Sequence, residues 1–216
     1  NLNESYRTGT NCFYCEIRGS PEAYEQIARR IAELSCTPIT PSKQTIAELA
    51  SILVRIELKK GECFLGADEV CKYIGYVQKG MIRQFYFKNK KDLTEHFASN
   101  DTLFFCIESF LRQRKAALLA EALENTVVYG IPHDSLLDLA TRNYEIETIY
   151  RGMLEESLIL SQRKMDSIRF ETANERYCRL LKEHPEVIQR APLSHIASYL
   201  LMTPETLSRV RASLQL

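Results

Sequence analysis

The sequence predicts an α+β fold: an N-terminal antiparallel β-roll with flanking helices, then one long helix, then a C-terminal helix-turn-helix of winged-helix-like type. Three observations lead to this prediction. Short runs rich in Val, Ile, Phe and Tyr extend from Ile56 to Tyr129, and one apolar stripe extends from Tyr144 to Phe170. Two short amphipathic segments then share a tight turn between residues 192 and 211. The first pattern is typical of strands and the other two are typical of helices.

Two helices are expected before the strands. Ser20 is a suitable N-cap for a helix over residues 21–35, and a second short helix is expected over 43–54 after a Pro-rich break. The apolar positions of both helices follow a helical period: Tyr24, Ile27, Ile31 and Leu34 in the first, and Ile46, Leu49, Ile52 and Leu53 in the second. Each helix therefore has one face to bury against the strands that follow.

Between Ile56 and Tyr129 the apolar runs are short and separated by turn-forming residues. These separators are Lys60-Gly61, Gly66-Ala-Asp68, Lys79-Gly80, Lys88-Asn-Lys-Lys91 and Asn100-Asp101. Strands at such spacing favour a small antiparallel barrel or roll.

The segment from Tyr144 to Phe170 predicts one helix of about seven turns. Its apolar stripe recurs at steps of four and three and consists of Ile146, Tyr150, Leu154, Leu158, Ser161, Met165 and Ile168. Gly152 inside this helix costs roughly 1 kcal/mol, and Ser161 interrupts the stripe. A second copy of the chain would cover such a stripe, which predicts a homodimer. The alternative is a connecting helix that packs only on its own roll.

A further amphipathic helix over residues 172–184 precedes the helix-turn-helix. In the helix-turn-helix, Ile196, Ala197 and Leu200 share one face of the first helix, and Leu207 and Val210 of the second helix point toward it. Thr203 is a good N-cap, Pro204 suits the first helical position, and Glu205 lies in the first turn. We expect Leu201 and Met202 to fill the turn. Leu201 stands where Gly is common, so positive φ there would be strained.

The outward residues of the second helix are of the kinds that read DNA bases. Arginine pairs bidentately with guanine, and glutamate accepts from cytosine. The candidate DNA contacts are Ser194, Thr203, Glu205, Thr206, Ser208, Arg209 and Arg211, with Arg190 and His195 as further candidates for phosphate. The alternative is an ordinary helical pair in which Glu205 and Arg209 form a solvated ion pair of roughly 0.3 kcal/mol.

Composition restricts the function classes. The 216-residue chain has zero formal net charge, so any nucleic-acid footprint must be local. With no run of 18 apolar residues and no signal segment, we expect a cytoplasmic protein without membrane association. Four scattered His residues and the lack of a nucleophile–base pairing predict that it is not an enzyme.

Cysteine usage predicts reduced thiols, because seven is an odd number and a chain of this size needs no disulfides. Cys12 and Cys15 alone have ligand-like spacing. No second pair follows them, so we predict no metal site. The alternative for this stretch is a poorly ordered N-terminal segment.

The order of parts, from about Ile46 to the end, resembles the Crp/Fnr superfamily of bacterial transcription regulators. Leu58-Lys-Lys-Gly-Glu62 and the stretch from Tyr73 to Arg83 are similar to two strand–turn signatures of the cyclic-nucleotide-binding fold. Asn174-Glu-Arg-Tyr177 and Pro204-Glu-Thr-Leu-Ser-Arg209 resemble Bacteroidetes-type members. The resemblance implies a cyclic-nucleotide-binding-like roll and base contacts from Glu205, Ser208 and Arg209. It also implies a homodimer on a near-palindromic operator of double-stranded DNA, with RNA polymerase as a further partner.

The effector site departs from the family pattern. Glu108 matches the ribose-binding Glu, but Ile107 replaces the neighbouring Gly, and Ala116-Ala117 stands near the position of the phosphate-binding Arg. Cyclic AMP is therefore not predicted, and the effector is unidentified. The candidate effector pocket comprises Glu108, Ser109, Arg112, Arg114 and Lys115. The alternative for the last three is a solvated basic loop.

These observations divide the chain into four parts: an N-terminal helical extension (1–40), a β-roll sensor domain (41–142), a dimerisation helix (143–170) and a helix-turn-helix domain (171–216). The leading hypothesis is a homodimeric regulator whose roll senses a small effector. The alternative is a ligand-sensing or protein-interaction module that has lost DNA binding.

Overall fold

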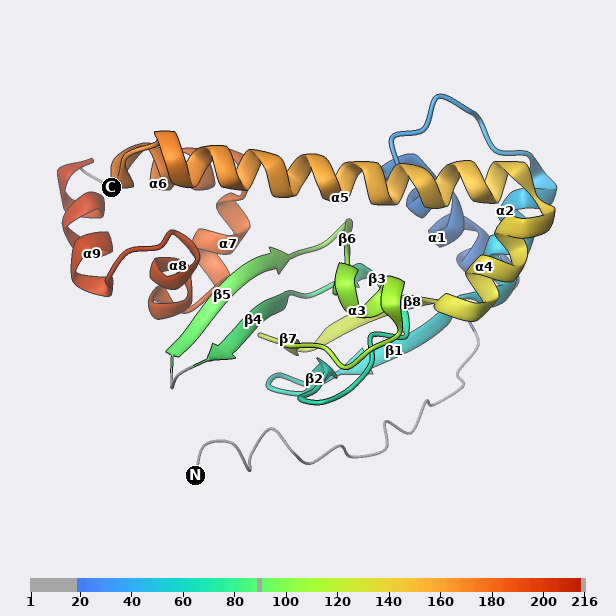
Figure 1. Ribbon diagram of the computed structural model, residues 1–216, viewed down its shortest axis with the longest axis horizontal. Coiled ribbons are helices and arrows are strands. Elements are labelled where there is room, and N and C mark those ends of the chain that lie inside the picture. Colours follow the sequence, from blue (N-terminus) through green and yellow to red (C-terminus); the bar gives the residue numbers. More distant parts are fainter. Residues whose placement is uncertain (1–18, 89–90, 215–216) are drawn as a thin grey trace.

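The structure, a computed structural model, describes residues 19–88 and 91–214 (Figure 1). Its elements are, in chain order, α1 (Pro21–Leu34), α2 (Lys43–Ile52), β1 (Val54–Leu58), β2 (Cys63–Leu65), β3 (Tyr73–Lys79), β4 (Ile82–Lys88), β5 (Lys91–Ala98), β6 (Thr102–Phe104), α3 (Ile107–Arg112), β7 (Leu118–Ala122), β8 (Thr126–Pro132), α4 (His133–Arg142), α5 (Tyr144–Phe170), α6 (Ala173–Glu183), α7 (Pro185–Arg190), α8 (Leu193–Tyr199) and α9 (Pro204–Ser213). The predicted α+β class is confirmed.

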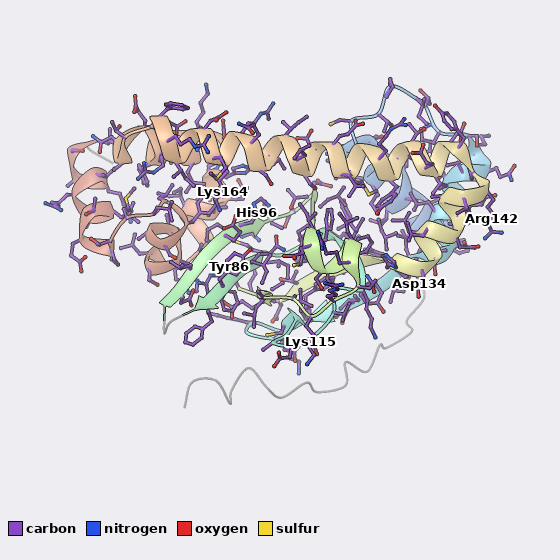
Figure 2. All side chains as sticks on the ribbon, viewed as in Figure 1. Tyr86, His96, Lys115, Asp134, Arg142 and Lys164 are labelled. Atoms are coloured by element: carbon purple, nitrogen blue, oxygen red, sulfur yellow. The ribbon has the colours of Figure 1, made fainter. Side chains whose placement is uncertain are left out.

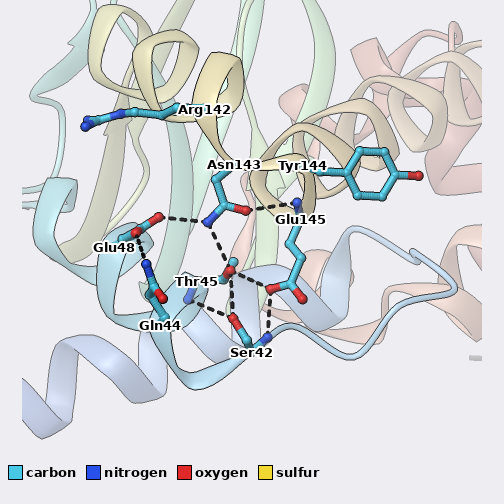
Figure 3. Close-up of a pocket in the computed structure, with 8 residues that line it drawn as sticks. All are labelled: Ser42, Gln44, Thr45, Glu48, Arg142, Asn143, Tyr144 and Glu145. Atoms are coloured by element: carbon cyan, nitrogen blue, oxygen red, sulfur yellow. Dashed lines mark hydrogen bonds between the residues drawn. The ribbon is translucent and has the colours of Figure 1, made fainter.

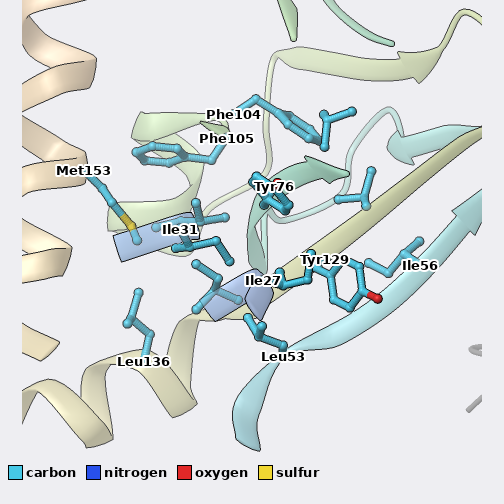
Figure 4. Close-up of a cluster of buried hydrophobic side chains, with 14 of the residues drawn as sticks. Ile27, Ile31, Leu53, Ile56, Tyr76, Phe104, Phe105, Tyr129, Leu136 and Met153 are labelled. Atoms are coloured by element: carbon cyan, nitrogen blue, oxygen red, sulfur yellow. The ribbon is translucent and has the colours of Figure 1, made fainter. Parts of the chain in front are cut away.

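The strands form the predicted antiparallel roll. They make two four-stranded sheets, in the orders β1-β8-β3-β6 and β2-β7-β4-β5. Apolar side chains from both sheets, such as Tyr76 and Ile82, are buried in one cluster, part of which Figure 4 shows. Burial of this apolar surface is the main term that holds the two sheets together.

Helices α1 and α2 begin where the sequence predicts. The Ser20 and Ser42 side chains each accept a backbone N–H in the first turn. Ile27 and Ile31 of α1 are buried in the same cluster as the roll, and the ring of Tyr24 meets that of Tyr129 edge-on at 5.3 Å. The N-terminal helix thus shares the core of the roll.

The long helix α5 has the predicted bounds, Tyr144–Phe170, and Asn143 caps it. It runs along one side of the whole molecule (Figure 1). Its first half is buried against the roll through Ile146, Ile149 and Met153. Gly152 has a packing role that the sequence did not reveal, because a Cβ there would lie 2.3 Å from the backbone oxygen of Ser35.

Helices α6–α9 form a C-terminal head at the far end of α5 (Figure 1). Its core includes Tyr177, Leu180 and Leu207, and two residues of the roll, Met81 and Phe97, complete it. Residues 171–214 contain no strand, so no wing is part of this described region.

One serine fastens the head to the open edge of a sheet. The hydroxyl of Ser198 on α8 accepts from the Thr94 N–H at 2.9 Å and donates to the Asp92 carbonyl at 3.1 Å. Both partners belong to β5, which is the last strand of its sheet. The head thereby satisfies backbone groups that an edge strand would otherwise leave unpaired.

Three helices were not expected from the sequence. Two of these, α3 and α7, have six residues each, too short for a clear apolar period. The third, α4, has only Leu136 and Leu139 buried. Among the described residues no helix is both long enough and apolar enough to cross a bilayer.

Candidate functional site

The turn between α8 and α9 closes the C-terminus of the first helix and leads directly to the N-cap of the second. Leu201 has φ of 53°, its N–H donates to the Ser198 carbonyl at 3.1 Å, and the Met202 N–H donates to the Ala197 carbonyl at 3.0 Å. This is the Schellman pattern, which usually has Gly at the left-handed position. Leu201 is 50% exposed, so the expectation that it fills the turn is wrong for its side chain.

Helix α9 starts at the predicted cap. The Thr203 hydroxyl accepts from the Thr206 N–H at 3.2 Å, and Pro204 occupies the first turn. Hydrogen bonding to its own backbone N–H and then to Thr203 lowers the pKa of Glu205, and nearby Arg209 acts in the same direction. Glu205 therefore presents a carboxylate at neutral pH.

The two faces of α9 separate as the sequence predicts. Leu207 and Val210 are buried against the head core. The exposed residues of this candidate DNA-reading face are Thr203, Glu205, Ser208, Arg209 and Arg211, with Thr206 half-buried among them and Ser194 exposed at the start of α8. Glu205 and Arg209 form no ion pair in this described region, and Arg209 instead donates to the Thr206 hydroxyl at 3.3 Å. The Glu205–Arg209 ion pair expected for an ordinary helical pair is therefore not present.

Two of the expected phosphate contacts are poorly suited to that role, one because it is paired and the other because it is buried and neutral. The Arg190 guanidinium forms an ion pair with Glu124 of the roll. The Nδ1 atom of His195 is buried with no hydrogen-bond partner, and burial followed by repulsion from Arg83 lowers the pKa of this imidazole to about 4. His195 is therefore neutral near pH 7, which argues against its prediction as a phosphate ligand.

A groove of about 1280 Å³ lies between the roll, α3, α5 and the head. Its roll side is largely apolar, with Leu103, Phe104 and Leu118 from strands and Ile107 and Leu111 from α3. Leu160 of α5 faces it from the opposite wall. A concave, mostly apolar space with a few polar groups is typical of small-molecule sites.

The predicted effector residues divide between this groove and other places. Glu108 and Arg112 line it. Ser109 is buried, and its hydroxyl accepts from the Cys71 N–H at 2.9 Å and donates to the Arg114 carbonyl at 2.5 Å, so it braces α3. Arg114 and Lys115 are exposed and do not line the groove. Figure 2 shows Lys115 on the side of the roll away from α5.

The polar residues at the head end of the groove give no local signal in the sequence. Lys164 of α5 bonds the Glu95 carboxylate at 2.9 Å and lies 5.3 Å from the centre of the Tyr199 ring. His96 lies beside it (Figure 2), and burial, Lys164 and His184 lower the pKa of His96 to about 4. Lys164 thus links α5, β5 and α8, a relation that only the tertiary fold creates.

A smaller, polar pocket of about 370 Å³ lies at the start of α5 (Figure 3). Glu145 accepts from the Ser42 N–H at 2.8 Å, and Asn143 donates to the Thr45 hydroxyl at 3.1 Å and to Glu48 at 2.8 Å. Because these groups bond one another, the pocket braces α2 against the α4–α5 junction.

The second half of α5 has an apolar stripe that nothing in the described chain covers. Leu158 is 71% exposed, and Met165, Ile168 and Phe170 are exposed as well. The predicted stripe therefore divides into a buried first part and an open second part.

The sequence prediction for cysteine concerned Cys12 and Cys15, which lie outside the described residues. Within 19–88 and 91–214, no group of three or more His, Cys, Asp or Glu side chains is placed to hold a metal ion.

No protein-family model matches the sequence, and no curated protein matches it. Solved structures do match. FixK2 from Bradyrhizobium japonicum is similar with a TM-score of 0.65 and 22% identity, over 76% of this chain and 85% of that one. A putative cyclic nucleotide binding protein from Ruegeria pomeroyi has a TM-score of 0.62 and 22% identity, over 91% and 88%.

A putative transcriptional regulator of the Crp/Fnr family from Eubacterium rectale also has a TM-score of 0.62, with 14% identity over 81% of this chain and 84% of that one. At identities of 14–22%, these matches show the fold. The protein has the fold of the Crp/Fnr transcription regulators.

Proposed function

We propose that the protein is a sequence-specific DNA-binding transcription regulator of the Crp/Fnr type, acts in the cytoplasm and has no enzymatic activity. One observation carries the proposal: α9 is capped at Thr203, buried through Leu207 and Val210, and presents Glu205, Ser208 and Arg209 to solvent. A helix with this construction fits the major groove, where Arg reads guanine and Glu reads cytosine.

The exposed stripe of α5 supports a homodimer. Leu158, Met165 and Ile168 recur at helical spacing, and water contact of such a stripe is unfavourable unless a second α5 packs on it. A two-fold dimer places two α9 helices in successive major grooves, about 34 Å apart. The expected operator is therefore a near-palindrome, and RNA polymerase is the further partner implied by a regulator.

The groove between the roll and α5 is the proposed effector site. Glu108 and Arg112 belong to it, whereas Ser109, Arg114 and Lys115 do not supply its surface. Ala117 lines the groove near the position where the family pattern has a phosphate-binding Arg, so the wall at that point is apolar. A buried cyclic phosphate needs a fixed cation or several donors, which disfavours cyclic AMP as the effector.

A second candidate is a ligand-sensing or protein-interaction module that does not bind DNA. The zero net charge and the Arg190–Glu124 pair favour it, because both reduce the attraction for phosphate. In this candidate the ligand groove and the dimer are retained, but α9 does not enter the major groove of DNA.

Selection of DNA from a random pool tests the proposal. The wild-type chain should enrich a near-palindrome, and Arg209→Ala should lose affinity for it by about tenfold or more, as expected for one bidentate base contact. Light scattering in the same buffer should show an unchanged dimer. If neither the apo protein nor the protein screened with candidate effectors enriches any sequence, the DNA-binding proposal fails and the module remains.

A further inference from the structure

One guanidinium joins the end of the long helix to the turn of the head. Arg176 on α6 donates from Nε to the Leu200 carbonyl at 2.9 Å and from Nη1 to the Glu171 carbonyl at 2.7 Å. Glu171 is the C-cap of α5, and Leu200 is the C-cap of α8. The carbonyls of both C-caps therefore accept hydrogen bonds from the same side chain.

Arginine suits this position for two reasons. The last carbonyls of a helix have no partner within the helix and carry the negative end of its dipole, so a cation at a C-terminus is favourable. A guanidinium also holds its donors in one rigid plane, so it fixes the two carbonyls relative to each other. The ammonium group of a lysine has the charge but not this fork.

The Leu200 carbonyl lies at the start of the turn that sets the direction of α9. Leu201, the next residue, has the left-handed conformation that is unfavourable for a side chain with a Cβ. Thr203, three residues after Leu200, caps α9. A bond that holds Leu200 therefore stabilises a strained turn and sets where the reading helix begins.

A neighbouring arginine, Arg179, provides a matched control for Arg176. Arg179 also lies on α6, and it bonds the Glu171 carboxylate at 3.2 Å and the Ser167 hydroxyl. It thus ties α6 to the same end of α5. It makes no hydrogen bond to the turn between α8 and α9.

We propose that Arg176 is a positioning residue that transmits a movement of the C-terminal end of α5 to the reading helix α9. The inference rests on the proposed DNA reading by α9 and names how it is regulated. A shift of the Glu171 carbonyl changes the position of the guanidinium, and the Leu200 carbonyl follows because the fork is rigid. Effector binding against α5 then alters DNA affinity through the turn.

The first test needs no DNA. Hydrogen–deuterium exchange is measured on the full-length dimer for wild type, Arg176→Gln and Arg179→Gln. Arg176→Gln should raise amide exchange over residues 200–207 by about tenfold, because the strained turn loses its support. Arg179→Gln should change these amides by less than about twofold. Equal exchange over 200–207 in the two variants would overturn the proposal.

The second test compares specific with non-specific DNA, using the selected operator and a scrambled duplex. Arg176→Gln should weaken operator binding about tenfold and leave scrambled-duplex binding within about twofold, because Arg176 is bonded to two backbone carbonyls and is not one of the candidate phosphate contacts. A general loss of head structure would weaken both equally, and that result contradicts the positioning role.

Arg176→Lys is the second variant if Arg176→Gln does not give a folded dimer by circular dichroism and light scattering. Arg176→Lys keeps the charge but should show the same faster amide exchange over residues 200–207 as Arg176→Gln. Exchange at the wild-type rate would contradict the role of the planar guanidinium. If the wild type selects no operator, the proposed DNA function fails, and the exchange comparison still decides whether Arg176 holds the turn.

Discussion

Gly152 shows how one residue fixes the place where α5 crosses the N-terminal helix. A Cβ at this position would lie 2.3 Å from the Ser35 carbonyl oxygen and 2.7 Å from Thr37 Cγ2. Ser35 is the C-cap of α1 and is buried, so its backbone has little room to move. Close approach of two backbones is the physical reason for glycine here, and it outweighs the helix propensity that glycine lacks.

Gly152→Ala should therefore destabilise the protein by about 1–3 kcal/mol, although Ala is about 1 kcal/mol better in an unpacked helix. Urea unfolding followed by circular dichroism measures the change. Gln162→Ala, at an exposed position of the same helix, should stay within about 0.5 kcal/mol of wild type. A wild-type midpoint for Gly152→Ala would show that α1 does not approach α5 this closely.

His195 makes stability depend on pH. The pKa of the folded imidazole is about 4, mainly because of burial, and it lies below the ordinary value near 6.5. Between these values the unfolded chain binds a proton that the folded chain does not, so stability is fully present above pH 6.5 and is lost as pH falls toward 4. His96, whose pKa is also about 4, acts in the same direction.

His195→Leu should reduce the loss of unfolding free energy between pH 6.5 and pH 4.5, because one of the groups that titrate only after unfolding is gone. Unfolding curves at several pH values measure the slope. Ser194→Ala, which alters the exposed neighbour, should keep the wild-type slope. A variant slope as steep as that of wild type would mean that His195 is already charged in the folded protein.

The elements with strong local signals are those that the sequence predicted well. The caps at Ser20 and Thr203 accept from backbone N–H groups only three residues away, so they can be predicted without the fold. The groove between the roll and α5 could not be predicted in this way. Lys164 meets Glu95 across 69 positions, and Ser109 turned out to support α3 from inside rather than face a ligand.

Helix α5 has two apolar faces with different partners. Ile149 and Met153 are buried against the roll, whereas Leu158 is exposed in the single chain, and Met165, also exposed, lines the groove between α5 and the roll. Periodicity alone joined these into one stripe because it cannot tell a surface that the same chain covers from one that a second copy covers.

Leu158→Glu should convert the dimer to monomers. A charge would be introduced from each of the two copies into an apolar seam, so the dimer Kd should rise by about a hundredfold or more. Sedimentation velocity measures the change. Arg163→Glu, on the opposite side of α5, is the control and should remain dimeric. If Leu158→Glu is also dimeric, α5 is not the interface.

The zero net charge of the chain and the two-fold symmetry of the proposed dimer together set the expected affinity for DNA. The chain has no net charge, and its reading face offers few cations beyond Arg209 and Arg211. One head alone should therefore bind DNA weakly, since phosphate contacts supply most non-specific affinity. The two heads of the proposed dimer should bind as a linked pair, which raises affinity without any new contact.

The spacing of the two half-sites is the sharpest test of a dimer that reads DNA with two heads. An insertion of about five base pairs at the centre of the selected operator turns one half-site to the opposite side of the duplex, whereas about ten restore the side but lengthen the span. For a dimer joined through α5, the half-turn insertion should reduce affinity to the level of a scrambled duplex. An affinity that is unchanged by this insertion would contradict a two-headed reader.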